Sequence, residues 1–381
     1  MKALYRTTSL CATCKNALPA EVRQGDDGSV VMHKACPEHG EQTVQLSTDA
    51  DWYMQTRATE PQLTAPRENC REVELGCPFD CGPCEHHEQE VRLPVVTITS
   101  ACNLDCPICY VHNKNKDAYF MPVADFEQVL RHLKRAHGEV DIVNFTGGEP
   151  LLHPDFGQFL RLSREAGVHR VTICSNGIKL ARDEALVKQL ADAGARVALS
   201  FDTFDQAVDY ELQGAKLIDL KLRCLELLEK HGVDTTLIPV MTKGLNDHEI
   251  GRILELALKL RCVRHVEVHT ITFTGQGGTS FSRERRISMV EVLDQNRGDH
   301  GRLARAARLR AVTLRAPAVL PNRLSIARSR GRPAGAVHPL HVARNAVRLP
   351  VGAPVHRAVA QARARHVERY RRAVGERRRP R

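Results

Sequence analysis

Between residues 93 and 295 the sequence alternates short apolar runs with amphipathic stretches, and this alternation constrains the fold more than any other feature. The apolar runs are rich in β-branched residues and nearly continuous, as is typical of parallel strands covered on both faces. The stretches between them, such as 123–138 and 246–260, have helical spacing. Repeated about six times, the pattern predicts an α/β fold, a partial (β/α)6 TIM-like barrel. The expected strands are 93–99, 140–146, 169–175, 196–202, 235–241 and 265–271.

An open, doubly wound sheet is the structural alternative to a barrel. Its dinucleotide-binding form carries a G-x-G-x-x-G turn after the first strand. No such turn follows residues 93–99, where the sequence continues with a cysteine-containing loop instead. The barrel is therefore the favoured fold.

Composition divides the chain into four regions. These are a cysteine-containing segment at 1–60, a turn-rich link at 61–92, the barrel at 93–295, and a tail at 296–381 rich in Arg, Ala and Pro. The net charge of +10 belongs to the tail, which from Arg297 onward has 22 Arg, no Lys and three acidic residues. There is no apolar run long enough for a transmembrane helix and no apolar leader at the N-terminus. We therefore expect a cytoplasmic protein without a membrane span.

Thirteen cysteines are present, and most of them lie in three tight clusters. In a reducing compartment such spacing indicates metal ligation rather than disulfide bonds. One cluster follows the first expected strand, with the spacing Cys102-x3-Cys106-x2-Cys109. Three thiolates on one loop can ligate three irons of a [4Fe–4S] cluster and leave the fourth iron open. The loop lies at the carboxyl end of the strand, where barrel enzymes keep their active sites.

This loop resembles the cluster-binding loop of the radical S-adenosylmethionine superfamily, and a second motif supports the resemblance. Thr146 is followed by Gly147, Gly148, Glu149 and Pro150 at the end of the second strand. The resemblance implies that S-adenosylmethionine binds the open iron and is cleaved to a 5′-deoxyadenosyl radical. It also implies that the Gly-Gly-Glu-Pro turn offers backbone groups and the Glu149 carboxylate to the cofactor's ammonium.

Two further strand ends resemble the positions that contact the cofactor's ribose in this superfamily. Asn176 follows the third strand, while Ser200 and Asp202 close the fourth. Ordinary turn and cap residues would give the same pattern. We keep these three residues as candidate cofactor contacts.

The link repeats the cysteine spacing, as Cys77-x3-Cys81-x2-Cys84. Because this loop precedes the barrel, we assign the catalytic cluster to the later loop and an auxiliary [4Fe–4S] cluster to this one. The sequence does not identify a fourth ligand for this cluster, and Cys70, His86 and His87 are the nearby candidates. Zinc is the alternative occupant, since three Cys and a His also suit zinc.

The N-terminal region has the ligand spacing of a zinc ribbon. Cys11-x2-Cys14 is followed by Cys36 and His39, and the Gly25–Gly28 segment between them suits a hairpin. Four N/S ligands without an open position describe a structural zinc site. A single iron in a rubredoxin-like cage is the alternative, because both metals accept tetrahedral sulfur ligation.

The assembly of ribbon, auxiliary loop and barrel resembles a narrower group, the 7,8-dihydro-6-hydroxymethylpterin methylases and tetraether lipid synthases. The resemblance covers residues 1 to about 293 and implies methylation or C–C bond formation on a pterin or lipid-like substrate. It also implies an electron donor such as flavodoxin or ferredoxin. Peptide or cofactor maturation is the alternative within radical enzymes. A zinc-ribbon nucleic-acid binder with a basic tail is the alternative of another class, and the paired cysteine and glycine motifs argue against it.

The tail has no sustained helical or strand periodicity, so we expect it to be disordered. A basic segment can be a nucleic-acid arm. However, Arg, Ala, Pro and Gly without Lys are what GC-rich DNA encodes when read out of frame. Synonymous codons exist for 308–325 that, when read one base later, encode a coherent segment with a C-x4-C pair. A frameshift is therefore the preferred interpretation, and sequencing codons 290–330 of the gene tests it.

Overall fold

The N-terminal region forms a small antiparallel sheet followed by one short helix. The computed structural model describes residues 1–58, 65–68, 72–74, 84–85, 87, 91–112 and 115–295, and the backbone of 309–312 and 323–328. The sheet contains β1 (Lys2–Leu10), β2 (Ala17–Gln24), β3 (Val30–Cys36) and β4 (Gly40–Ser47) in sequential order, and α1 (Ala50–Arg57) follows. Val22 and Val30 are fully buried between the sheet and Ala50 of α1. This is the small ribbon-like domain that the cysteine spacing predicted.

The predicted hairpin joins β2 to β3. The amide of Gly25 donates to the carbonyl of Ser29, and Gly28 has a φ of +80°. The Asp27 carboxylate accepts hydrogen bonds from the amide and hydroxyl of Ser29. Glycine suits the left-handed position because it has no Cβ to clash. The turn therefore aligns β3 so that it delivers Cys36 opposite the first cysteine pair.

The second sheet contains the six predicted barrel strands, side by side, parallel and in chain order. The fifth predicted strand, 235–241, is not continuous, because Pro239 divides it into β9 and the short β10. Among the described residues, β5 and β11 do not pair with each other, so the barrel is partial. The strands are β5 (Val95–Thr99), β6 (Ile142–Gly147), β7 (Arg170–Ser175), β8 (Arg196–Ser200), β9 (Thr235–Ile238), β10 (Val240–Met241) and β11 (Val263–Thr270).

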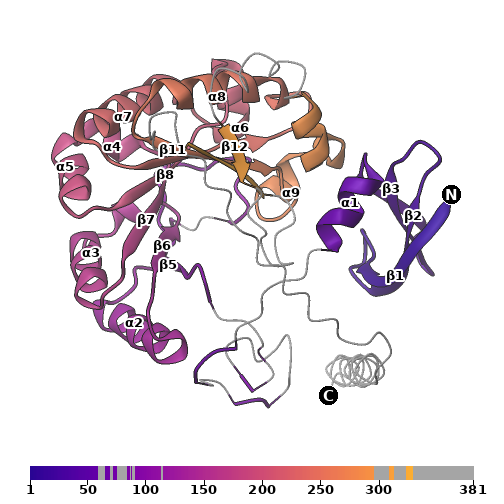
Figure 1. The fold of residues 1–381 in the computed structure, drawn as a ribbon, viewed down its shortest axis with the longest axis horizontal. Coiled ribbons are helices and arrows are strands. Elements are labelled where there is room, and N and C mark those ends of the chain that lie inside the picture. The colour runs from indigo at the N-terminus through magenta and orange to yellow at the C-terminus, as the bar shows by residue number, and fades with distance from the viewer. Residues whose placement is uncertain are drawn as a thin grey trace, which may run out of the picture. The chain divides into compact units, whose positions relative to one another are not determined.

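Helices cover the outer face of this sheet (Figure 1). The fully buried rings of Phe126, Phe145 and Phe159 join two of these helices to β6 in one continuous core. Such a core fixes the strands and so fixes the loops at their carboxyl ends. No helix among the described residues has the length and apolarity that a membrane crossing requires. The α-helices are α2 (Val123–His137), α3 (Phe156–Glu165), α4 (Ile178–Arg182), α5 (Glu184–Asp192), α6 (Gln206–Gln213), α7 (Ile218–His231), α8 (Ile250–Lys259) and α9 (Gly277–Ser280).

The tail differs from its prediction in two segments. β12 (Leu309–Val312) pairs with β13 (Arg323–Arg328), and β13 runs antiparallel to β11. The expectation of a wholly disordered 296–381 does not hold for these strands. The sequence carries a short strand-like signal here, because apolar Leu324 and Ile326 alternate with Arg323 and Ser325.

Candidate functional site

The loop that carries Cys102, Cys106 and Cys109 follows the carboxyl end of β5. All three cysteines are half-buried. The amide of Cys102 donates to the Asn115 side chain at 2.9 Å, and the amide of Cys109 donates to the carbonyl of Cys106 at 2.9 Å. The first bond ties the start of the loop to Asn115, and the second closes a tight turn within the loop. The loop therefore stands at the carboxyl end of a barrel strand, and its role in catalysis stays a prediction.

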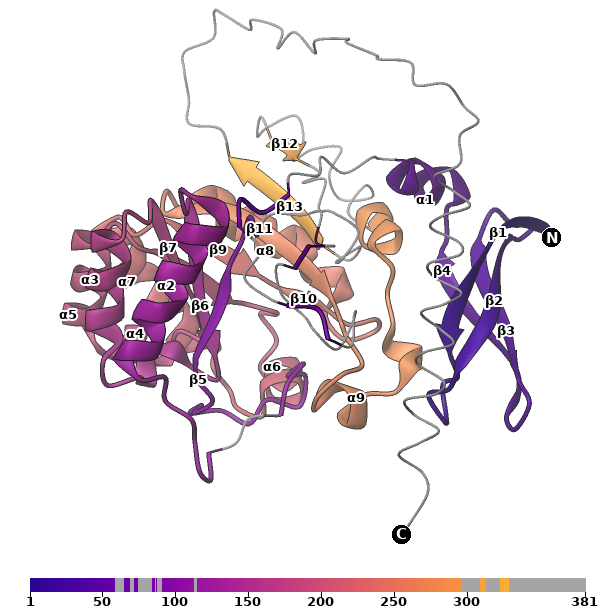
Figure 2. The ribbon, with the colours of Figure 1, turned by 90° about the horizontal axis from the view of Figure 1, so that it is seen from below.

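Residues far along the chain hold the cysteine loop in place. The amide of Ile108 donates to the carbonyl of Leu212 in α6, and the amide of Gly277 in α9 donates to the carbonyl of Cys109. The Gln276 side chain also donates to the carboxylate of Asp105. Helices α6 and α9 therefore lie at the same end of the sheet as the loop (Figure 2).

The Gly-Gly-Glu-Pro turn is joined directly to the start of the cysteine loop. The amide of Gly148 donates to the carbonyl of Thr99 at 2.9 Å, and the amide of Glu149 donates to the carbonyl of Ala101 at 2.7 Å. A Cβ on Gly147, whose φ is +145°, would collide with the Thr99 carbonyl, and a Cβ on Gly148 would collide with that of Ala101. Both glycines are needed because the two backbones approach so closely.

The carboxylate of Glu149 is buried and faces β7. One oxygen accepts from the amide of Asn176 at 2.8 Å and from the Ser175 hydroxyl at 3.2 Å, and the other accepts from the amide of Leu151 at 3.2 Å. Burial raises the pKa of Glu149 to about 7, although these hydrogen bonds and Lys179 oppose the shift. The side chain therefore links β6 to β7. Its predicted contact with a cofactor ammonium stays a prediction.

The three candidate ribose contacts differ in their surroundings. The Asn176 side chain donates to the Asn103 side chain at 2.7 Å, so it connects β7 to the cysteine loop. Ser200 is half-buried at the end of β8. Asp202 is different, because its carboxylate is fully buried and accepts from the amide of Val240 at 2.8 Å and from the Gln213 side chain at 2.6 Å. That engagement does not support the predicted ribose contact of Asp202.

Sequence reasoning missed a buried network beside Cys106. The Cys106 thiol donates to the Gln213 carbonyl oxygen at 3.2 Å, and the Gln213 amide reaches Asp202. The Lys221 ammonium lies 3.7 Å from Asp202 and 3.6 Å from Asp209, and all three of these charged side chains are almost completely buried. Burial raises the pKa of Cys106 to about 12, with the neighbouring thiols adding to the shift and Lys221 opposing it. No local spacing predicts this network, because its members come from the cysteine loop, the segment after β8, α6 and α7.

The four N-terminal residues that were predicted to bind metal form a compact set. The ligand atoms of Cys11, Cys14, Cys36 and His39 all lie within 4.8 Å of one another. The amide of the Gln42 side chain donates to the Cys11 sulfur at 3.2 Å. Burial raises the pKa of Cys11, but this hydrogen bond and those from the backbone outweigh it and lower the pKa to about 5. A thiolate is the form that binds metal, so the donor set fits a closed zinc or iron site.

The structure describes the auxiliary cysteine loop only in part. Cys77 and Cys81 lie outside the described residues, and Cys84 is buried.

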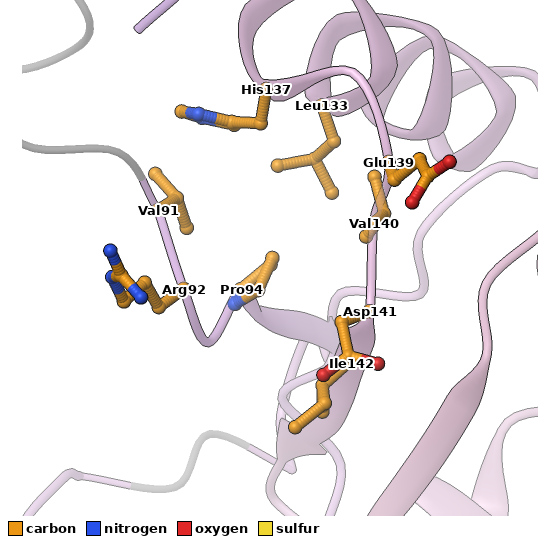
Figure 3. Close-up of a pocket in the computed structure, with 9 residues that line it drawn as sticks. All are labelled: Val91, Arg92, Pro94, Leu133, His137, Glu139, Val140, Asp141 and Ile142. Atoms are coloured by element: carbon orange, nitrogen blue, oxygen red, sulfur yellow. The ribbon is translucent and has the colours of Figure 1, made fainter. Parts of the chain in front are cut away.

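The cavity of Figure 3 is lined by residues that include Arg92, Pro94 and Ile142, which stand before or at the start of β5 and β6. This is the amino-terminal end of the sheet, opposite to the cysteine loop, so the cavity is not part of the candidate site.

Comparison with known proteins identifies relatives for both regions. Residues 96–257 match the model of the radical SAM superfamily, and residues 3–48 match the HMPTM N-terminal zinc ribbon domain. The 7,8-dihydro-6-hydroxymethylpterin dimethyltransferase of Methanocaldococcus jannaschii is 31% identical over 292 residues, which cover 76% of this chain and 57% of that protein. The GTP 3′,8-cyclase of Chlorobaculum tepidum is 31% identical over 42% of this chain and 48% of its own.

Among solved structures, Streptococcus suis SuiB bound to precursor peptide SuiA has a TM-score of 0.49 and 15% identity, over 79% of this chain and 71% of that one. The chain spans about half the length of the curated relatives named above.

Proposed function

Because this chain belongs to the radical S-adenosylmethionine superfamily of enzymes, we propose that Cys102, Cys106 and Cys109 hold a [4Fe–4S] cluster and that the substrate is a pterin. When bound, the cluster and S-adenosylmethionine supply a 5′-deoxyadenosyl radical, which takes hydrogen from the substrate for methylation or C–C bond formation. The observation that carries the proposal is the junction of the cysteine loop with the Gly147–Gly148 turn, held by two backbone hydrogen bonds.

The residues of the site fit these groups. Three thiols on one loop satisfy three irons and leave the fourth without a protein ligand. The Gly147–Gly148 turn places backbone without side chains beside that loop, where a ligand can approach it closely. Asn176 fixes the loop to β7 through Asn103, so the cysteines and the turn keep one mutual arrangement.

The substrate assignment rests on the relatives. The alignment with the pterin dimethyltransferase covers 76% of this chain, and residues 3–48 separately match the HMPTM N-terminal zinc ribbon domain. GTP 3′,8-cyclases align over a smaller part, and GTP likewise carries an amino-oxo-pyrimidine ring. A pterin is therefore preferred to a lipid-like substrate, and methylation to peptide or cofactor maturation.

Two further metal centres and a redox partner belong to this proposal. Cys11, Cys14, Cys36 and His39 hold zinc, with a single iron as the alternative. Cys77, Cys81 and Cys84 hold an auxiliary [4Fe–4S] cluster. A flavodoxin or ferredoxin supplies the electron for cleavage of S-adenosylmethionine.

An anaerobic assay for 5′-deoxyadenosine tests the proposal. The purified protein should be brown, with absorbance near ~400 nm from cysteine-bound clusters. With dithionite and S-adenosylmethionine, the parent should form 5′-deoxyadenosine and Cys106→Ala should form none. Cys262→Ala is the matched control, since Cys262 is a buried thiol outside the cysteine loop, and it should retain product formation. Colourless protein that contains only zinc would instead favour the nucleic-acid binder.

A further inference from the structure

Lys221, near the start of α7, is a buried cation close to the cysteine loop. Its side chain is 2% exposed, and the side chains of its carboxylate neighbours, Asp202 and Asp209, are 0% and 1% exposed. Burying a charge is costly even where an opposite charge compensates for it. Three charged side chains that are buried together therefore call for an explanation other than stability.

The contacts of the lysine are electrostatic rather than directed hydrogen bonds. Its ammonium lies 3.7 Å from the Asp202 carboxylate and 3.6 Å from the Asp209 carboxylate. Within the part of the chain that the structure describes, this ammonium has no hydrogen-bond partner. What Lys221 contributes at this position is consequently its positive charge.

The two carboxylates are held by backbone groups. The Asp202 carboxylate accepts from the amide of Val240 at 2.8 Å, and the Asp209 carboxylate accepts from the amide of Leu217, the residue before α7. These bonds do not involve the lysine side chain. Replacing Lys221 by an uncharged residue of similar length therefore changes the charge of the group more than its geometry.

The group leads directly to the sulfur of Cys106. The Gln213 side chain donates to Asp202 at 2.6 Å, and its oxygen accepts from the Cys106 thiol at 3.2 Å. Burial raises the pKa of Cys106 to about 12, and of its charged neighbours Lys221 lowers this pKa whereas Asp202 raises it. Buried charges are screened little by solvent, so the charge of Lys221 acts on this sulfur although Asp202 and Gln213 stand between them.

We propose that Lys221 sets the reduction potential of the cluster assigned to Cys102, Cys106 and Cys109, because its positive charge offsets the buried carboxylates and favours uptake of the electron. Net charge around an iron–sulfur cluster is a main determinant of its potential, and groups behind the ligands tune a metal centre. The inference rests on the proposed function, since it takes the cysteine loop as the place where the cluster binds.

A redox titration of the anaerobic holoenzyme, followed by electron paramagnetic resonance, tests the inference. The signal that S-adenosylmethionine perturbs reports the catalytic cluster. Lys221→Met should lower the equilibrium constant for one-electron reduction about tenfold, which makes the midpoint potential ~59 mV more negative. Lys34→Met, which removes a buried lysine from β3 of the ribbon, is the matched control and should keep the parent's potential.

Asp209→Asn provides a second variant with the opposite sign. It removes a negative charge beside Lys221, and its side-chain oxygen can still accept from the Leu217 amide. The potential should therefore become less negative. A merely structural role would loosen the surroundings of Cys106 in both variants and move both potentials in the same direction.

The inference is overturned if both variants shift the potential in the same direction, or if Asp209→Asn has the potential of the parent. Should Lys221→Met bind no iron, Asp209→Asn decides alone, because a potential that is less negative than the parent's supports the inference and any other result contradicts it. If the parent itself binds no iron, the proposed function fails instead.

Discussion

The buried carboxyl group of Glu149 gives a stability prediction whose size follows from the structure. Burial raises its pKa from 4.5 to about 7 in the folded chain. Between these values the folded state binds a proton that the unfolded state releases, so stability falls as the pH rises through this window. At about 1.4 kcal/mol per pK unit, the loss attributable to Glu149 is about 3 kcal/mol.

The variant Glu149→Gln isolates this loss. Below pH 5 it should be less stable than the parent by about 1–3 kcal/mol, because an amide N–H replaces an acceptor for the Asn176 or Leu151 amide. Above pH 7 the variant should gain about 3 kcal/mol relative to the parent, since it carries no proton to lose.

Urea unfolding of the full chain at pH 5 and pH 8, followed by circular dichroism, measures the effect. Other groups titrate in both proteins, so the informative quantity is the difference between parent and variant at each pH. Glu255→Gln, on the exposed surface of α8, should show a difference that does not change with pH. The reasoning fails if the Glu149→Gln difference is the same at both pH values.

Three other predictions concern the metal centres. Gly148→Ala should reduce the iron and sulfide bound per chain, because its Cβ meets the Ala101 carbonyl, whereas Gly157→Ala within α3 meets only a flexible side chain and should bind the parent's amount. Gln213→Leu should make the midpoint potential of the proposed catalytic cluster less negative in a redox titration monitored by electron paramagnetic resonance. The Gln213 side-chain oxygen faces the Cys106 sulfur, and the negative end of the amide dipole disfavours the added electron. Thr203→Val should leave that potential unchanged, because Thr203 is also buried but its hydroxyl donates to Glu249. The Cys36→Ser variant should bind one equivalent less of zinc or iron by elemental analysis, and its residues 1–58 should become sensitive to protease. Unchanged metal content would contradict the proposed ligand set.

The sequence was sufficient for the elements whose signal is local. All six barrel strands were predictable because each is a short apolar run between helical stretches. The cluster of candidate metal ligands in the ribbon was equally predictable. Cys11 and Cys14 lie close together in one turn, and the hairpin turn at Gly25–Gly28 brings Cys36 and His39 opposite them. Pro239 was visible in the sequence, and its effect on the fifth strand follows from the missing amide donor.

The surroundings of the site were not predictable in the same way. Asp202 stands at a strand end, where a ligand contact is a reasonable expectation. Its actual partners are Gln213, which is the last residue of α6, and Lys221 in α7. Whether a polar side chain at a strand end meets a ligand or a neighbouring helix depends on packing between segments that are distant in sequence. No spacing rule for one segment contains that information.

Asp202 also shows why the loop and its support have to be considered together. The Lys221 ammonium faces both Asp202 and Asp209, so this buried group contains two carboxylates and one cation. A buried ion pair is weak evidence for stability, because desolvation offsets much of the attraction. The group instead orients Gln213, whose side-chain N–H donates to Asp202 and whose side-chain oxygen accepts from the Cys106 thiol. In metal centres, partners of this kind fix the ligands and tune the metal. The cysteine spacing accordingly predicts which residues bind iron, while α6 and α7 determine the electrostatic environment of Cys106.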